Sequence, residues 1–212
     1  MDMPDESSYS DTSLEETDLR ALFQIQKDAF DRDPYPSLND RLEAIQAVKS
    51  MMLENHGDIA DALEEDFGTH PRQLAALVEL LLVLNKIKYI TKNLKKWMKP
   101  DPRKIDVLSW GLSRGSVLYQ PLGVVGNMSP WNIPFLASLA PLVDMLSAGN
   151  RVMIKPSEMT PASSSLLKEM VSRTFQEDQV AVVPGDVAVA EEFARLPWDH
   201  LLYTGNPAVG KL

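Results

Sequence analysis

Up to about residue 100, apolar residues recur every three or four positions, which is the spacing of one face of a helix. This pattern predicts four helices. Prolines, glycines and a Ser-x-x-Asp sequence mark where they begin and end. The first helix is expected to begin at Asp18 and to end at the break at residues 33–36. The second follows the N-cap Ser37, has Asp40 in its first turn and ends at Gly57. A short third helix ends at Gly68, and the fourth spans residues 71–98.

From Leu122 onward, short apolar runs alternate with helical segments. The runs LGVVGNM, RVMI, VAVV and HLLYT are predicted strands, and residues 134–147, 161–175 and 187–196 are predicted helices. Such alternation predicts parallel β-α-β units with right-handed crossovers, so the fold class is α/β with an incomplete doubly wound, Rossmann-like sheet. Before them, IDVLSW and GSVLYQPLG are interpreted as two strands of a hairpin around Gly111.

These elements divide the chain into four regions. Residues 1–17 are rich in Ser, Asp and Glu and are expected to be a disordered arm. We expect a helical region at 18–100, a hairpin at 101–120, and at 121–212 the first strands of a nucleotide-binding sheet that is truncated at Leu212.

The net charge of the chain limits the classes of partner that it is expected to bind. A net charge of −9 disfavours nucleic acid and anionic membranes, which select basic surfaces. The lysines of residues 86–99 could form an anion-binding patch, but a solvated face at a helix C-terminus is the favoured interpretation. Glu79 interrupts the longest apolar stretch, so no membrane span is predicted, and the acidic N-terminus is unlike a signal peptide. We therefore expect a cytoplasmic protein.

The chain has no cysteine, which excludes a disulfide, a thiolate metal ligand and a cysteine nucleophile within these 212 residues. Its three histidines, His56, His70 and His200, are far apart and lack partners at metal-ligand spacing. No metal site is predicted.

Ligands of doubly wound sheets bind outside the carboxyl ends of the strands, which directs attention to four loops. In the first, SPWNIPF, Asn132 either serves a ligand or makes an Asx turn that starts the next helix, and the residues alone favour the turn. In the second, KPSEMTP, Glu158 with Lys155 could hold ribose hydroxyls. Equally, Thr160 could be an N-cap, Glu158 a helix-dipole partner and Lys155 a surface lysine.

The other two loops contain glycines. Gly185 suits either close approach of a ligand or a plain turn. Residues 205–211 match the G-x-x-x-x-G-K pattern of a P-loop, but Leu212 stands where Ser or Thr would ligate Mg²⁺. Nucleotide hydrolysis is therefore only an alternative. The glycines of residues 205–211 still suit a backbone that lies close to a pyrophosphate.

Taken together in order and spacing, PLGVVGNMSPWNIPF, LAPLVDMLSAGNRVMIKPSEMTP, VVPGD and LLYTGNPAVGK resemble the aldehyde dehydrogenase superfamily over residues 19–212. DPYPSL, LKKWMKP, YQPLGVVG and LPWDHLLYTG are most similar to its coniferyl aldehyde dehydrogenase subgroup. The resemblance implies NAD(P)-dependent oxidation of an aldehyde to the carboxylic acid, with coniferyl or a similar aromatic aldehyde as the candidate substrate. NAD is the expected cofactor and NADP is possible, because Glu158 would repel a 2′-phosphate.

The resemblance also implies the roles of single residues. Asn132 would donate its side-chain N–H to the oxyanion, together with the backbone N–H of a catalytic cysteine. Lys155 and Glu158 would hold the adenosine ribose, and Ser157 would also bind the cofactor. The residues matching positions that line the cofactor cleft are Met128, Ser129, Pro130, Trp131, Gly185, Gly205, Asn206 and Val209. The hairpin matches an oligomerisation arm, which implies a homodimer or tetramer.

Three departures from the family pattern change these expectations. Asn206-Pro207 stands where a serine usually contacts the pyrophosphate, and Ala190 stands where many members have glycine. The catalytic cysteine and the general-base glutamate belong to segments after Leu212, so this chain alone is expected not to oxidise aldehydes. A non-catalytic fragment that assembles with full-length subunits is therefore the main alternative.

Overall fold

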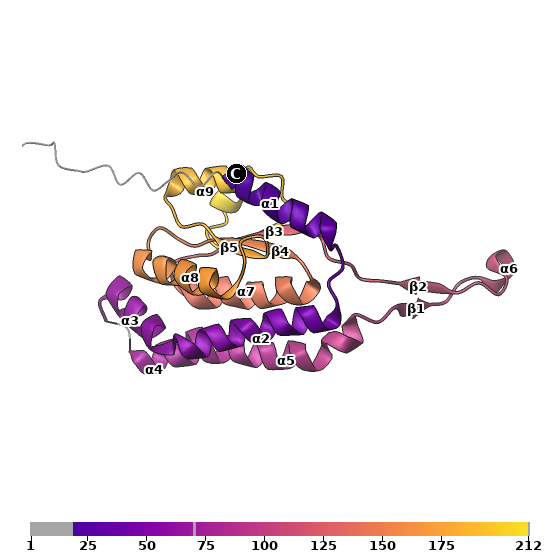
Figure 1. Cartoon of the computed structure of the whole chain (residues 1–212), viewed down its shortest axis with the longest axis horizontal. Helices are drawn as coiled ribbons and strands as arrows, with labels where there is room; N and C mark the ends of the chain where they lie inside the picture. Colours follow the sequence, from indigo (N-terminus) through magenta and orange to yellow (C-terminus); the bar gives the residue numbers. More distant parts are fainter. Residues whose placement is uncertain (1–18, 70, 212) are drawn as a thin grey trace, which may run out of the picture.

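The computed structural model describes residues 19–69 and 71–211; the predicted acidic arm lies outside them. Within these residues the chain forms stacked layers around a central sheet (Figure 1). Helices α1 (Leu19–Arg32) and α9 (Val187–Ala194) cover one face, and α7 (Pro134–Ala148) and α8 (Pro161–Thr174) cover the other. A further layer of helices packs outside α7 and α8 (Figure 1).

The sheet has the order β5-β4-β3-β6, and every neighbouring pair is parallel. Its strands are β3 (Val124–Met128), β4 (Arg151–Lys155), β5 (Val180–Val182) and β6 (His200–Tyr203), and a 3-10 turn, η2 (Val209–Lys211), follows. The predicted α/β class with parallel β-α-β units is confirmed. Both faces of the sheet are covered, which explains why the strands are nearly continuous apolar runs.

The outer layer begins with α2 (Leu38–Glu54) and α3 (His56–Phe67). The predicted N-cap is confirmed, because Ser37 and Asp40 form a reciprocal capping box. The predicted end of α2 at Gly57 is wrong. The Asn55 side chain donates to the Met51 carbonyl at 2.7 Å and the chain restarts as α3 at His56, so Gly57 lies inside the first turn of α3.

The predicted fourth helix is present as three consecutive segments: α4 (Arg72–Ala75), a π-helical stretch η1 (Ala76–Leu81), and α5 (Leu82–Trp97). The π-helical stretch was not predicted. It contains Glu79, which is only 1% exposed. Short π segments inside α-helices are frequent at functional sites.

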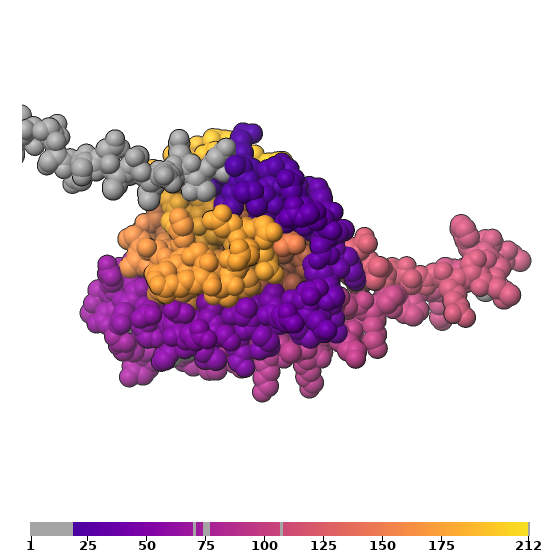
Figure 2. All heavy atoms as spheres, viewed as in Figure 1, coloured from indigo at the N-terminus to yellow at the C-terminus, as the bar shows by residue number. Residues whose placement is uncertain are grey.

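The predicted hairpin is an antiparallel pair, β1 (Asp101–Arg103) and β2 (Gly115–Val117), with a helical turn, α6 (Val107–Trp110), at its tip. The prediction of IDVLSW as a strand is wrong. Asp106 accepts the backbone N–H groups of Leu108 and Ser109, at 3.2 and 3.0 Å, and thereby starts a helical turn. The hairpin with its tip stands clear of the body (Figure 2).

Two apolar cores lie on opposite faces of the sheet. The larger joins α2, α3 and α5 to α7, α8 and the strands. The smaller core joins α1 and α9 to the other face. Gln26 of α1 is fully buried and stabilises this contact by donating to the carbonyls of Val152 and Glu177. Among the described residues, every helix is too short or too polar to cross a lipid bilayer.

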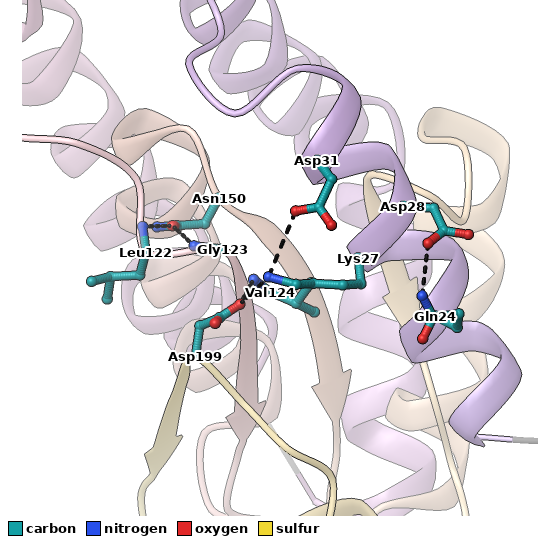
Figure 3. A network of polar contacts seen from close by, with 9 residues as sticks. All are labelled: Gln24, Lys27, Asp28, Asp31, Leu122, Gly123, Val124, Asn150 and Asp199. Atoms are coloured by element: carbon teal, nitrogen blue, oxygen red, sulfur yellow. Dashed lines mark hydrogen bonds and ion pairs between the residues drawn. The ribbon is translucent and has the colours of Figure 1, made fainter.

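A polar network fixes the start of β3 (Figure 3). Asp199 accepts the Val124 N–H at 2.8 Å, and the Lys27 ammonium lies 3.6 Å from the same carboxylate oxygen. The side-chain amide oxygen of Asn150 accepts the N–H groups of Leu122 and Gly123. Gly123 has a φ of 138°, and a Cβ there would overlap the Asp199 carboxylate. This position therefore requires glycine.

A second polar contact compensates for a proline inside α7. Pro141 has no N–H to give to the Ala137 carbonyl four residues earlier. The buried Asn127 side chain of β3 donates instead to the carbonyls of Ala137 and Ser138, at 3.3 and 3.2 Å. The strand thus satisfies a helix carbonyl that the proline leaves open.

Candidate functional site

Because all four strands of the sheet are parallel, their carboxyl ends and the loops after them lie along one edge. Met128, the last residue of β3, is in register with Lys155 on one side and Tyr203 on the other. The Ser129 N–H donates to the Lys155 carbonyl, and the Thr204 N–H donates to the Met128 carbonyl. The structure therefore brings the first, second and fourth loops together.

In the first loop, Ser129 is buried and shares a 2.8 Å hydrogen bond with Ser138 of α7, whereas Trp131 and Asn132 are exposed. The Trp131 ring lies 6.3 Å from the Phe67 ring, between ring centres. Asn132 does not start α7, because the N-cap is Ile133 and has no side-chain capping bond. Within the described residues the Asn132 amide has no hydrogen-bond partner. The Asx-turn interpretation is therefore wrong.

The open N-terminus of α7 is capped from another helix. A carboxylate oxygen of Glu79 accepts the N–H of Leu136, in the first turn of α7, at 2.6 Å. Burial raises the pKa of Glu79 to about 7, and hydrogen bonds from the backbone N–H groups of Leu136 and Phe135 partly offset this rise. The sequence interpretation missed this role, because the two residues are 57 positions apart.

In the second loop, Lys155 is only 2% exposed, so the interpretation as a surface lysine is wrong. Its ammonium donates to the Pro156 carbonyl at 2.6 Å. Burial lowers the pKa of Lys155, and the negative charges of Glu158 and Asp186 act in the opposite direction. A buried cation thus lies near two carboxylates, of which Asp186, the N-cap of α9, was not anticipated from the sequence.

The N-terminus of α8 repeats the arrangement seen at α7. Thr160 is its N-cap residue, but its hydroxyl makes no capping bond and is buried without a partner. Instead, Asp66 of α3 accepts the N–H groups of Ala162 and Ser163 at 2.9 and 2.8 Å. The alternative that made Thr160 the N-cap residue is therefore right about its position, but the Thr160 side chain does not provide the cap. Ser157 in the same loop accepts the Met159 N–H, and Glu158 is exposed.

The third and fourth loops have glycines for steric reasons that the structure makes visible. Gly185 has a φ of 151°, and a Cβ there would collide with Val189 of α9. A Cβ at Gly205 would collide with the Tyr203 ring. Asn206 accepts the Ala208 N–H at 2.8 Å, and both Asn206 and Val209 are exposed. The Thr204 N–H, which donates to the Met128 carbonyl, keeps this loop at the same edge as Lys155.

A separate open depression of about 540 Å³ lies between α3 and α8. It is lined by four carboxylates, Asp58, Asp61, Glu65 and Glu169. Such a lining repels a pyrophosphate. The strand edge, with a buried lysine and an unpartnered amide, is the better candidate for a nucleotide and a polar substrate.

Comparison with known proteins gives the family. A model of the aldehyde dehydrogenase family matches residues 7–212. A probable coniferyl aldehyde dehydrogenase of Pseudomonas aeruginosa is 44% identical over 193 residues, which are 91% of this chain and 40% of that protein. The coniferyl aldehyde dehydrogenase of Pseudomonas sp. strain HR199 is 38% identical over 191 residues, 90% of this chain and 39% of that protein. The chain thus spans about two fifths of the length of these relatives.

Solved structures agree with this result. AldH of Staphylococcus aureus, in a substrate-bound state, is 28% identical with a TM-score of 0.87 over 91% of this chain and 42% of that chain. An aldehyde dehydrogenase of Mycobacterium tuberculosis complexed with NAD+ is 24% identical and shares the fold, with a TM-score of 0.76 over 91% of this chain and 40% of that chain. Residues 7–212 of this chain, with the parallel sheet and its loop edge, belong to the aldehyde dehydrogenase family.

Proposed function

We propose that the chain provides the nucleotide-binding edge and one oxyanion donor of an NAD(P)-dependent aldehyde dehydrogenase, which oxidises an aldehyde to the acid. The observation that carries this proposal is the buried Lys155 beside Glu158 and Asp186, at the same strand edge as the unpartnered Asn132 amide. The coniferyl aldehyde dehydrogenases among its relatives support an aromatic aldehyde as substrate.

The residues at this edge fit a dinucleotide. Lys155 and Glu158, at and after the end of β4, would hold the hydroxyls of the adenosine ribose as a donor and an acceptor. Ser157 lies between them in the sequence. The exposed Glu158 carboxylate would disfavour a 2′-phosphate, which favours NAD over NADP. Met128, Pro130, Trp131, Gly185, Gly205, Asn206 and Val209 would border the cofactor.

The chemistry at the other end of the nucleotide would depend on Asn132. NAD, when bound, supplies a hydride acceptor. The Asn132 N–H would donate to the aldehyde oxygen as negative charge develops on it, and a preorganised donor of this kind contributes about 3 to 4 kcal/mol. Because the chain contains no cysteine, we propose that its 212 residues alone do not complete the reaction.

Nucleotide binding tests the proposal directly. We expect Lys155→Met to weaken NAD binding to this chain at least tenfold, because a charged donor is lost, and Glu158→Gln to raise the affinity for NADP relative to NAD. Isothermal titration calorimetry measures both effects. Lys168→Met, at an exposed lysine of α8, is the matched control and should bind like the parent chain.

Adding an aromatic aldehyde to the NAD-saturated chain should produce no NADH absorbance. NAD binding that is insensitive to Lys155→Met would contradict the assignment of the ribose site. NADH formation would contradict the proposed inactivity of the chain.

We also propose that the hairpin arm joins two copies of the chain. Leu108, Trp110 and Leu112 at its tip are 97%, 67% and 100% exposed, and apolar side chains on a projecting element mark an interaction surface. Replacing all three with serine should convert a dimer or tetramer to a monomer in analytical ultracentrifugation. Tyr89→Ser, at an exposed aromatic residue of α5, should leave the mass unchanged.

A monomeric parent chain would contradict self-association through the arm. If that monomer co-purified with a full-length dehydrogenase, and the triple variant did not, the alternative of assembly with intact subunits would be favoured. We further propose a cytoplasmic location, because the bacterial relatives and the acidic composition fit an enzyme of small metabolites.

A further inference from the structure

We infer that Glu79 is a positioning residue: it caps α7 in place of Asn132 and thereby leaves the Asn132 amide available to a ligand. The inference deepens the proposed function and relies on it for the identity of that ligand. The capping exchange itself can be tested without any nucleotide or aldehyde.

The need for an external cap arises from the residues before α7. Helix N-termini leave their first N–H groups without intrahelical partners, and an N-cap side chain normally accepts from the second or third residue of the helix. Here the N-cap residue is Ile133, whose side chain has no hydrogen-bond acceptor, and the first helical residue is Pro134. The next polar side chain along the loop is Asn132, which is a good capping residue.

Glu79 takes the acceptor role that Asn132 could otherwise fill. It accepts the N–H of Leu136, the third residue of α7, at 2.6 Å, and Phe135, the second, is also hydrogen-bonded to it through its backbone. Glu79 is 1% exposed, so water cannot readily replace its carboxylate as the cap. With these donors satisfied, Asn132 has no reason to turn toward the helix.

The π-helical stretch η1 is what presents Glu79 to α7. It packs against α7 and α3 and lies between α4 and α5. A π turn adds one residue to the helical repeat, which rotates the following side chains relative to a regular α-helix. The unusual local conformation and the buried carboxyl thus act at the same place, the start of α7.

Asp66 offers a matched control within the same chain. It caps α8 from another helix, as Glu79 caps α7, through the N–H groups of Ala162 and Ser163. Removing either cap should destabilise the fold, but only the loss of Glu79 should change the state of Asn132. This difference separates positioning from a general structural role.

The test is a double-mutant cycle with an NMR readout on the isotopically labelled chain. In the Glu79→Leu variant we expect faster hydrogen exchange of the Leu136 amide, by at least tenfold, and a shifted Asn132 side-chain NH₂ signal. Glu79→Gln, which keeps an acceptor, should restore both signals. Asn132→Ala should leave the unfolding constant of the parent chain unchanged but raise it several-fold in the Glu79→Leu background, where Asn132 has become the cap.

Three results would overturn the inference: an Asn132 signal unmoved by Glu79→Leu, an equal shift in Asp66→Leu, which removes the cap of α8 in the same way, or an Asn132→Ala effect that is the same in both backgrounds. If Glu79→Leu does not fold, the cap is tested by NMR on the parent chain. A scalar coupling across the hydrogen bond from the Leu136 nitrogen to the Glu79 carboxyl carbon supports the cap, and rapid exchange of the Leu136 amide with no coupling refutes it.

Discussion

Raising the pH from 4.5 to 8 should lower the free energy of unfolding by about 3 kcal/mol through Glu79 alone. The pKa of this carboxyl is raised from 4.5 to about 7 in the folded chain, so the folded state binds more protons than the unfolded state between these values. Stability therefore falls as the pH rises through this window, and it levels off above the folded pKa.

Urea denaturation of the parent chain and of Glu79→Gln, followed across this pH range, measures the effect as a difference between the two. Other carboxylates with shifted pKa values interfere little. Asp40 and Asp106 have lowered pKa values because of hydrogen bonds to Ser37 and Ser109, so their effects fall below pH 3.8. A difference between parent and variant that stays constant from pH 4.5 to 8 would show that Glu79 ionises as readily in the fold as in the unfolded chain.

Gly123→Ala should destabilise the chain by about 3 kcal/mol. Two costs add at this position. The φ of 138° strains any residue with a Cβ, and that Cβ would displace the Asp199 carboxylate from the Val124 N–H, leaving a buried donor unpaired. Thermal and urea unfolding give the magnitude.

Gly57→Ala is the appropriate control, because Gly57 lies in a helix with open space around it and alanine there should stabilise by about 0.5 to 1 kcal/mol. In an Asp199→Ala background, Gly123→Ala should cost less, because the carboxylate that collides with the new methyl group is gone. Equal costs in both backgrounds would mean that backbone strain alone accounts for the effect.

Most of the fold could be predicted because apolar periodicity reports directly on burial. The four strands of the parallel sheet and the helices between them were all anticipated within two residues. The errors lie where one polar side chain decides the local structure: Asn55 ends α2 before Gly57, and Asp106 turns IDVLSW into a helical turn. Periodicity carries no information on such contacts.

In the candidate site, too, local sequence patterns predict some residues, while contacts between distant residues decide others. Lys155, Glu158 and Asn132 could be singled out because they follow strands whose carboxyl ends meet at one edge. The caps provided by Glu79 and Asp66 could not, since their partners lie 57 and 96 residues away along the chain. Neither Asn132 nor Thr160 caps the helix that follows it, because these more distant carboxylates already accept the N–H groups there.

The position of α1 has a consequence for synthesis on the ribosome. Its apolar residues Leu19, Leu22 and Phe23 pack in the smaller core against residues from β3 to Leu196, and Gln26 bonds carbonyls 126 and 151 positions later. Helix α1 can therefore reach its place only after the strands and α9 have emerged from the ribosome. Until then the apolar face of α1 stays accessible to chaperones or to neighbouring nascent chains, so α1 is expected to be the last of the described helices to dock.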